Sequence, residues 1–183
     1  MNAQINAPQG VGVNPGGTFL CVADTGNHAV RMVNLIRLPP YSATNKCAAN
    51  DFGCSGLASF PQGLPAGSIN LVGGIIPDGG SDALPANGWQ SRLNGPQGCA
   101  VDDALNIYVA DTLNNRITVI DASGKMTLIA GGGSAFVSDG KAATTALLAF
   151  PVGIATDNKG VVYFTDRMGL IKQLMPVAAT PAK

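Results

Sequence analysis

Hydrophobic and small or polar positions alternate with a period of two over much of the chain, which indicates β-strands. The alternation is clearest in Val11-Gly12-Val13 and Cys99-Ala100-Val101. Successive side chains of a strand point to opposite faces, so one face of each such strand carries bulky groups and the other carries almost nothing. We expect these segments to be inner strands that are crowded against their neighbours around a central axis.

The same order of segments occurs three times along the chain. Each unit opens with Pro-x-Gly and an alternating strand, turns at residues rich in Asn, Asp and Gly, and ends its second strand on an aspartate. These aspartates are Asp24, Asp111 and Asp166. A polar corner leads to a third strand, and the first two units offer a fourth strand at 69–72 and 126–130. The sequence therefore predicts an all-β fold of propeller blades with four antiparallel strands each.

We predict one propeller unit over residues 1–183 with about three blades. Blade 1 is expected at 5–74 with an inserted loop at 38–68, blade 2 at 95–132 and blade 3 at 150–176, followed by a tail at 177–183. The third unit offers no regular fourth strand, because prolines at 176 and 181 oppose a central strand. We hypothesise that residues 2–6 of another copy fill that place.

Several segments resemble a known repeat. Residues 111–117, Asp-Thr-Leu-Asn-Asn-Arg-Ile, preceded by Pro-Gln-Gly-x-Ala-Val-Asp, are similar to the NHL repeat, and 24–28 match the same corner. The connectors after 73 and 131 resemble the blade-to-blade segments of bacterial extracytoplasmic NHL proteins. The third unit departs from the pattern, since its corner is one residue short and lacks Asn-Asn-Arg.

The resemblance implies a β-propeller, which is similar to a six-bladed disc in this family, so the chain is expected to be half of such a ring or a propeller fragment. Its unpaired blade faces need a cover, from a second copy, another chain or further sequence of a longer propeller. The family likeness also favours a periplasmic or extracellular location. Residues 1–5 have neither the basic nor the apolar segment of a signal peptide, and we expect upstream sequence to be missing.

Composition narrows the choice of partners. Charged residues make up 12% of the chain, with 11 Lys and Arg against 11 Asp and Glu, where roughly 25% charged residues is typical. Without clustered positive charge we expect no nucleic-acid binding. No apolar run approaches the roughly 20 residues that span a bilayer, so we expect no membrane insertion. A weakly charged surface favours contact with protein, by self-association or with other propeller or complex subunits.

The candidate binding site is the rim where the aspartate corners meet the long connectors 73–94 and 131–150. The second and fourth strands of an antiparallel blade end on the same side, which brings corners and connectors together. The candidate rim residues are Asp24, His28, Asp111, Asn115, Asp166 and Arg167. For the aspartates we favour a turn-capping role in which each carboxylate accepts backbone N–H groups. For His28, the only histidine, we favour a structural or solvent-exposed role.

No catalytic residue, metal ligand or cofactor is predicted. A propeller lyase or lactonase would need several ligands that converge near the axis, and the chain has one histidine and no glutamate. His28 has no nucleophile-elbow motif beside it, and the glycines at 131–133 lack the ending of a phosphate-binding loop. We expect a non-enzymatic scaffold for protein association or assembly. The alternative is a metal-dependent enzyme, similar to lyases or lactonases, once the ring is completed.

The chain has four cysteines. Cys47 and Cys54 lie in the inserted loop, and a disulfide between them is the preferred interpretation, because a short covalent loop would order an insertion in an oxidising compartment. Two free thiols are the alternative. Cys21 and Cys99 fall inside predicted strands, and we expect them to be small core side chains.

Overall fold

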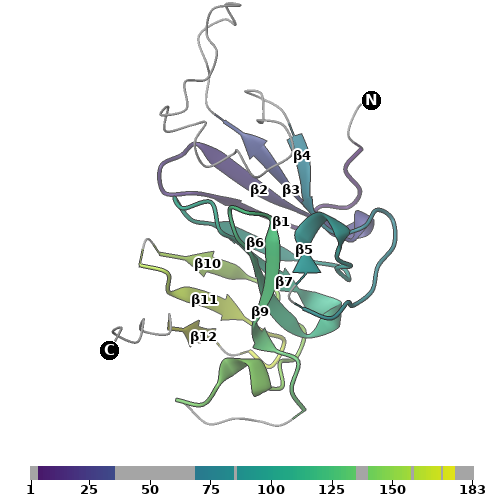
Figure 1. Ribbon diagram of the computed structural model, residues 1–183. Helices are drawn as coiled ribbons and strands as arrows, with labels where there is room; N and C mark the ends of the chain where they lie inside the picture. The colour runs from purple at the N-terminus through teal and green to yellow at the C-terminus, as the bar shows by residue number, and fades with distance from the viewer. Residues whose placement is uncertain are drawn as a thin grey trace, which may run out of the picture.

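The computed structural model describes residues 4–35, 69–84, 86–134, 140–157, 159–169 and 171–175, and over these residues it is all-β (Figure 1). The strands form three antiparallel sheets. The predicted blade architecture is therefore confirmed for the described part of the chain. The inserted loop at 38–68, and with it the proposed Cys47–Cys54 pair, lies outside the described residues.

Blade 1 is a four-stranded sheet in the order β1-β2-β3-β4. Its strands are β1 (Gly10–Val13), β2 (Phe19–Asp24), β3 (Ala29–Asn34) and β4 (Ile69–Gly73). Blade 2 has the order β5-β9-β8-β7-β6, with an additional short strand at its outer edge. Its strands are β5 (Ala86–Asn87), β6 (Gly98–Val101), β7 (Ile107–Asp111), β8 (Arg116–Ile120) and β9 (Lys125–Gly131). The sequence did not predict β5.

Blade 3 has three strands among the described residues, in the order β10-β11-β12. They are β10 (Ile154–Thr156), β11 (Val162–Thr165) and β12 (Ile171–Leu174). The inner strand β6 of blade 2 contacts both β1 and β10, so the three blades follow one another in chain order (Figure 1). No helix in the described ranges has the length and apolarity needed to cross a membrane.

Small residues let the inner strands approach each other closely. A Cβ atom added to Gly10 would lie 2.9 Å from the Cα of Gly98, and one added to Gly12 would lie 3.1 Å from the Cα of Ala100. Distances near 3 Å leave no room for a side chain, so β1 and β6 pack almost backbone to backbone. The alternation of large and small residues that predicted these strands is therefore the device that packs one blade on the next.

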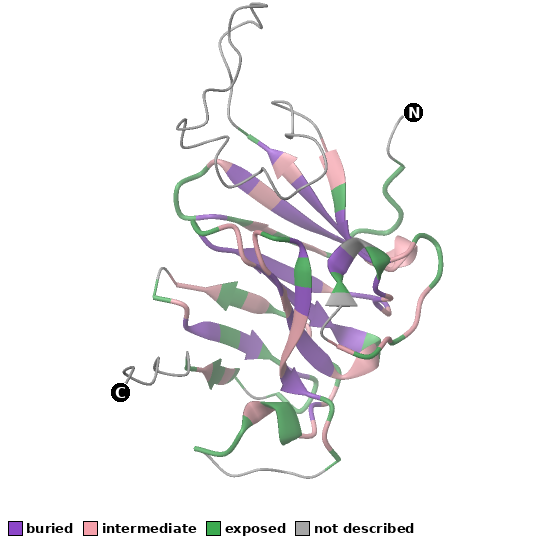
Figure 2. Cartoon of the chain, viewed as in Figure 1, coloured by how far each residue is buried: buried purple, intermediate pink, exposed green. Residues whose placement is uncertain are grey.

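The hydrophobic core lies between the blades rather than inside any one of them (Figure 2). The layer between blades 1 and 2 contains Phe19, Val30, Met32, Val72, Cys99, Val101, Ile107, Val109, Ile120 and Met126. The layer between blades 2 and 3 contains Ala100, Tyr108, Ala110, Ile117, Ala130, Leu148, Val162 and Phe164. A lone sheet cannot cover both of its faces, so each blade depends on its neighbours for stability.

A disulfide joins the first two blades, which corrects the expectation that Cys21 and Cys99 are simple core side chains. Cys21 on β2 is bonded to Cys99 on β6, with a Cα–Cα distance of 6.1 Å and a sequence separation of 78. Both residues are buried, as predicted. Their pairing follows from the packing of one blade on the next, because Cys21 lies on the face of blade 1 that meets β6.

Candidate functional site

The predicted rim is built from a repeated corner after the second strand of each blade. In blades 1 and 2 a buried aspartate, Asp24 or Asp111, is followed by a short 3-10 turn. The turn ends on a residue in the left-handed conformation, His28 with φ 53° or Asn115 with φ 52°. Asparagine adopts this conformation more readily than most side chains, which accounts for its place at the corner.

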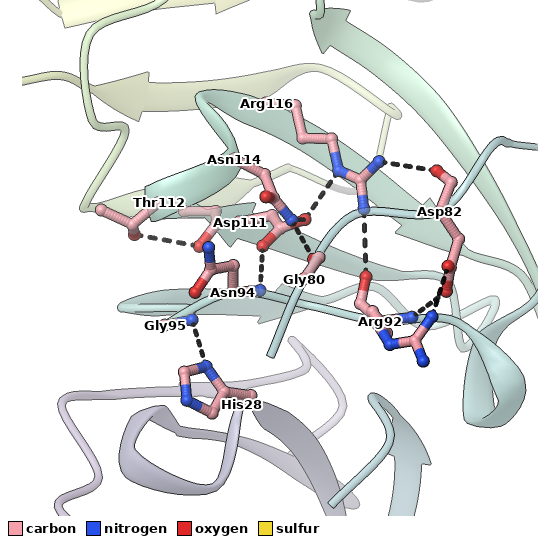
Figure 3. A network of polar contacts seen from close by, with 11 residues as sticks. His28, Gly80, Asp82, Arg92, Asn94, Gly95, Asp111, Thr112, Asn114 and Arg116 are labelled. Atoms are coloured by element: carbon pink, nitrogen blue, oxygen red, sulfur yellow. Dashed lines mark hydrogen bonds and ion pairs between the residues drawn. The ribbon is translucent and has the colours of Figure 1, made fainter. Parts of the chain in front are cut away.

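In blade 2 the carboxylate of Asp111 organises the corner (Figure 3). Its Oδ1 accepts a hydrogen bond from the backbone N–H of Asn94 at 2.7 Å, and its Oδ2 accepts from Asn114 Nδ2 at 2.8 Å and from Arg116 Nε at 2.6 Å. Burial raises the pKa of the Asp111 carboxyl, and the charge of Arg116 opposes that shift. Asp111 accepts a backbone N–H group, but that group belongs to the incoming connector and the turn receives no side-chain cap, which corrects the expected turn-capping role.

Arg116 extends the same network to the connector that enters blade 2. Its Nη1 donates to the carbonyl oxygen of Asp82 at 3.2 Å and its Nη2 to that of Arg92 at 3.1 Å (Figure 3). The Arg92 backbone N–H in turn donates to the Asp82 carboxylate at 2.6 Å, which lowers the pKa of Asp82. The buried ion pair therefore fastens the connector to the blade.

Blade 1 has the same corner, and the N-terminal segment takes the place of the connector. Asn6 N–H donates to Asp24 Oδ1 at 2.7 Å, and Arg31 Nη2 donates to the carbonyl oxygen of Gln4 at 3.0 Å. Arg31 Nε also pairs with Asp24 at 2.6 Å. Residues 4–6 thus lie on their own blade 1. The hypothesis that residues 2–6 supply a strand to another copy is contradicted for these residues by their bonds within the chain.

The corner of blade 3 differs from the other two. Asp166 accepts a hydrogen bond from Met168 N–H at 3.1 Å and pairs with Lys172. Arg167 is exposed, and its guanidinium lies 5.1 Å from the centre of the Phe150 ring. The corner is one residue short, as the sequence indicates, and the missing residue is the threonine that follows the aspartate in the other blades.

That threonine carries a contact between blades. Thr25 Oγ1 donates to the carbonyl oxygen of Pro96 at 2.6 Å, and Thr112 Oγ1 donates to that of Pro151 at 2.7 Å. In both cases the acceptor is the proline that opens the next blade. Sequence reasoning missed these threonines, although the repeated Asp-Thr pair was a signal that could have identified them.

His28 and Asn115 also hold the entry of the following blade. His28 Nδ1 accepts a hydrogen bond from Gly95 N–H at 3.0 Å, and Asn115 Oδ1 accepts from Phe150 N–H at 2.9 Å. Gly95 and Phe150 both have positive φ, 54° and 48°, and each precedes the proline of its blade. A ring nitrogen of His28 and an amide oxygen of Asn115 therefore accept equivalent hydrogen bonds from the start of the next blade.

The structure distributes the six predicted rim residues over three corners rather than into one pocket. The side chains of five of them make hydrogen bonds or ion pairs within the molecule, whereas the exposed side chain of Arg167 lies over the Phe150 ring. Across the described ranges no three side chains of His, Cys, Asp or Glu are grouped so that they could hold a metal ion.

The two flanks of the molecule are a second candidate surface. The outer face of blade 1 exposes Val11 at 67% and Val13 at 53%. The outer face of blade 3 has a shallow hollow. The hollow is lined by Gly153, Ile154, Ala155, Tyr163, Phe164, Thr165 and Ile171. Exposed apolar groups gathered on one sheet face are typical of a protein contact.

Comparison with known proteins supports the repeat assignment. A family model described as the NHL repeat matches residues 93–120. The curated protein SUPPRESSOR OF QUENCHING 1, chloroplastic, from Arabidopsis thaliana is 28% identical over 215 residues, covering 96% of this chain and 20% of the relative. The chain thus spans about a fifth of the length of this curated relative.

Solved structures share the fold. An auxiliary nutrient binding protein from Bacteroides ovatus is 19% identical with a TM-score of 0.58, over 91% of this chain and 36% of that chain. A chain of the nidogen/laminin complex is 16% identical with a TM-score of 0.52, over 94% of this chain and 46% of that chain. At such identities the likeness concerns the fold alone. The chain therefore carries a match to the NHL repeat at residues 93–120, and its sheets share a propeller-like fold with these structures.

Proposed function

We propose that this chain is a non-enzymatic propeller scaffold that associates with other protein through the outer faces of its first and last blades. The proposal rests on the different exposure of two equivalent valines. Val13 on β1 is 53% exposed, whereas Val101, at the same strand position of blade 2, is 1% exposed because blade 1 covers it. Blade 1 thus presents to solvent a face that is core in the next blade.

The energetic reason is the apolar surface left in water. Burying a valine side chain contributes about 1.5–3 kcal/mol relative to leaving it exposed. Leu71 on β4 is 36% exposed on the same sheet, and Ile171 on blade 3 is 79% exposed. Covering these side chains would remove apolar groups that are costly to hydrate, and it would extend the alternation of sheet and core that stabilises the rest of the chain.

We further propose a periplasmic or extracellular location. The buried Cys21–Cys99 disulfide supports this location, because disulfides persist in oxidising compartments and are rare in reducing ones. The similarity to a chain of a nidogen/laminin complex supports association with protein as one use of the fold, although that partnership is a property of the other protein.

A charge placed on the outer face of blade 1 tests the scaffold proposal. Val13→Lys should lower the mass of the native assembly, measured by analytical ultracentrifugation on protein purified without denaturation, because a lysine cannot be buried there unpaired. Leu113→Lys is the matched control, since Leu113 is 48% exposed but lies at a corner rather than on an outer face. A wild-type chain that sediments alone at high concentration would refute the proposal.

A further inference from the structure

Both contacts between blades in this chain follow one rule. We call the face of a blade that carries Gly12, Ala100 or Ala155 its small-residue face, and the face that carries Val11, Cys99 or Ile154 its large-residue face. The small-residue face of blade 1 packs on the large-residue face of blade 2, where Cys21 meets Cys99. The small-residue face of blade 2 packs on the large-residue face of blade 3, where a Cβ atom on Gly98 would lie 3.2 Å from Ile154 Cγ2.

The two outer faces are the two halves of this same contact. Blade 1 exposes its large-residue face, on which Val11 is 67% exposed. Blade 3 exposes its small-residue face, which carries Ala155 and its strand partner Tyr163, 39% exposed. The matching tyrosine of blade 2, Tyr108, is 8% exposed and packs against Val162 of blade 3. Among the residues that the structure describes, no large-residue face packs against Tyr163 as blade 3 packs against Tyr108.

Charge does not oppose contact between these faces. On the large-residue face of blade 1, Arg31 is buried and paired with Asp24. The small-residue face of blade 3 carries Thr165, Ile171 and Gln173 beside Tyr163, all of them uncharged. The large residues exposed on blade 1 and the small residues exposed on blade 3 are therefore complementary, and both faces belong to the same chain.

We propose that the occupant of the outer face of blade 1 is blade 3 of a second copy of this chain, seated as blade 1 is seated on blade 2. This inference rests on the proposed scaffold function and adds the partner and the register. The contact joins two different patches, so it is heterologous, and two copies close a ring if both contacts form at once.

The native Cys21–Cys99 disulfide shows which two positions should be close enough to cross-link in the proposed contact. Cys21 pairs across its sheet with Gly12, as Tyr163 pairs with Ala155, so these two residues occupy equivalent positions. Val11 is equivalent to Cys99 in the same way, since each precedes the second small residue of its inner strand. The double variant Val11→Cys, Tyr163→Cys should therefore place two thiols in the relationship that Cys21 and Cys99 have, about 6 Å between Cα atoms.

The experiment is mild oxidation of this double variant, in a background with Cys47→Ser and Cys54→Ser, followed by non-reducing electrophoresis and intact mass. We expect a shift from the mass of one chain to that of two, or to a ladder if the ring stays open, reversed by reductant. The matched control is Val11→Cys, Ser123→Cys, because Ser123 lies in an exposed turn of blade 2. It should remain at the mass of one chain, as should each single variant.

The other outcomes separate this inference from the proposed function. If the wild-type protein assembles but the double variant forms no more cross-link than its controls, the second-copy register is refuted and the scaffold proposal stands. An assembly whose mass is not a multiple of the chain mass would likewise refute the second copy and leave the scaffold proposal standing. If the wild-type chain is solitary, both proposals fail. Mixing copies with two different tags gives a further check that needs no cysteine, because co-purification of the tags is expected.

Discussion

Thr112 donates its hydroxyl to the carbonyl oxygen of Pro151 at 2.7 Å, across the boundary between blades 2 and 3. Thr25 makes the equivalent bond to Pro96 at 2.6 Å. Both bonds satisfy a proline carbonyl at the point where the next blade begins. Blade-to-blade cohesion in this chain therefore includes directional polar contacts at the rim in addition to the apolar layers between the sheets.

Replacing Thr112 by valine should lower the free energy of unfolding by about 1–2 kcal/mol, because the Pro151 carbonyl is left without its donor. Thr118 provides the matched control. Within the described residues it is a buried side chain whose Oγ1 has no hydrogen-bond partner. Thr118→Val should therefore be neutral or stabilising by up to about 1 kcal/mol. Urea denaturation of both variants measures the contrast, and equal losses would contradict this account of Thr112.

Asp111→Asn should destabilise the protein by about 3–5 kcal/mol, because it leaves the Arg116 guanidinium buried without a counter-charge. The side chains of this pair are 0% and 7% exposed. The pair between Arg92 and Asp78 is the control, since its side chains are 41% and 54% exposed. Asp78→Asn should cost less than about 1 kcal/mol. Denaturant midpoints measure both losses of stability. Similar values for the two variants would show that burial does not increase the contribution of the corner pair.

Tyr108 should make the stability of the protein depend on pH in the alkaline range. Burial, the nearby charge of Asp102 and the hydrogen bond from Tyr108 to Asp102 raise the pKa of Tyr108 to about 12. The unfolded value is about 10, so the folded state holds this proton more tightly. The resulting stability is fully present below about pH 10 and is lost as the pH rises toward 12. Stability curves between pH 9 and 12 should fall less steeply for Tyr108→Phe than for the wild type, and curves of equal slope would contradict this account of Tyr108.

Removing the Cys21–Cys99 disulfide should lower stability by about 2–4 kcal/mol, because the bond closes a long loop and restricts the unfolded chain. The Cys21→Ala, Cys99→Ala variant should have a lower guanidinium midpoint that reductant changes little. The variant with Cys47→Ser and Cys54→Ser should keep a reductant-sensitive midpoint. Thiol alkylation of the unfolded, unreduced wild type tests the predicted Cys47–Cys54 bond, since two modified cysteines would exclude it.

His28→Asn should preserve stability, because Asn115 makes the same contact in blade 2 with an amide oxygen. Asparagine also tolerates the left-handed backbone at this position. His28→Ala should lose about 1 kcal/mol, since Gly95 N–H would lose its acceptor. Thermal melting of the two variants is the measurement. A loss as large for asparagine as for alanine would mean that the imidazole has a role that the corner geometry does not explain.

The strands were predictable because the same alternation of large and small residues occurs three times, each time between Pro-x-Gly and a turn rich in Asn, Asp and Gly. The alternation around Gly12 and Ala100 reflects the close approach of the inner strands, so the packing of one blade on the next can be inferred from the sequence of a single strand. The corner aspartates could be located from the sequence, because each ends a strand and precedes a polar turn. Their main-chain partners could not, because Asp24 and Asp111 accept N–H groups from Asn6 and Asn94, which are 18 and 17 residues away in the sequence.

Other features depend on how one blade lies on the next, and no local pattern contains that information. The bond between Cys21 and Cys99 requires the lateral register of two sheets separated by 78 residues. β5 pairs over only two residues with β9, too few for a periodic signal. Residues 4–6 bind the first corner as residues 92–94 bind the second, an equivalence that lies in their hydrogen bonds and not in a shared sequence pattern.

The Cys21–Cys99 bond has a consequence for how the chain can vary. The segment 36–68 lies between the two cysteines in the sequence, so a protease cut anywhere in it would leave both fragments covalently attached. Insertions or deletions in that interval likewise leave the cross-link between β2 and β6 in place. Natural relatives and engineered versions should therefore tolerate grafted peptides or cleavage sites there, with the first blade still fastened to the second.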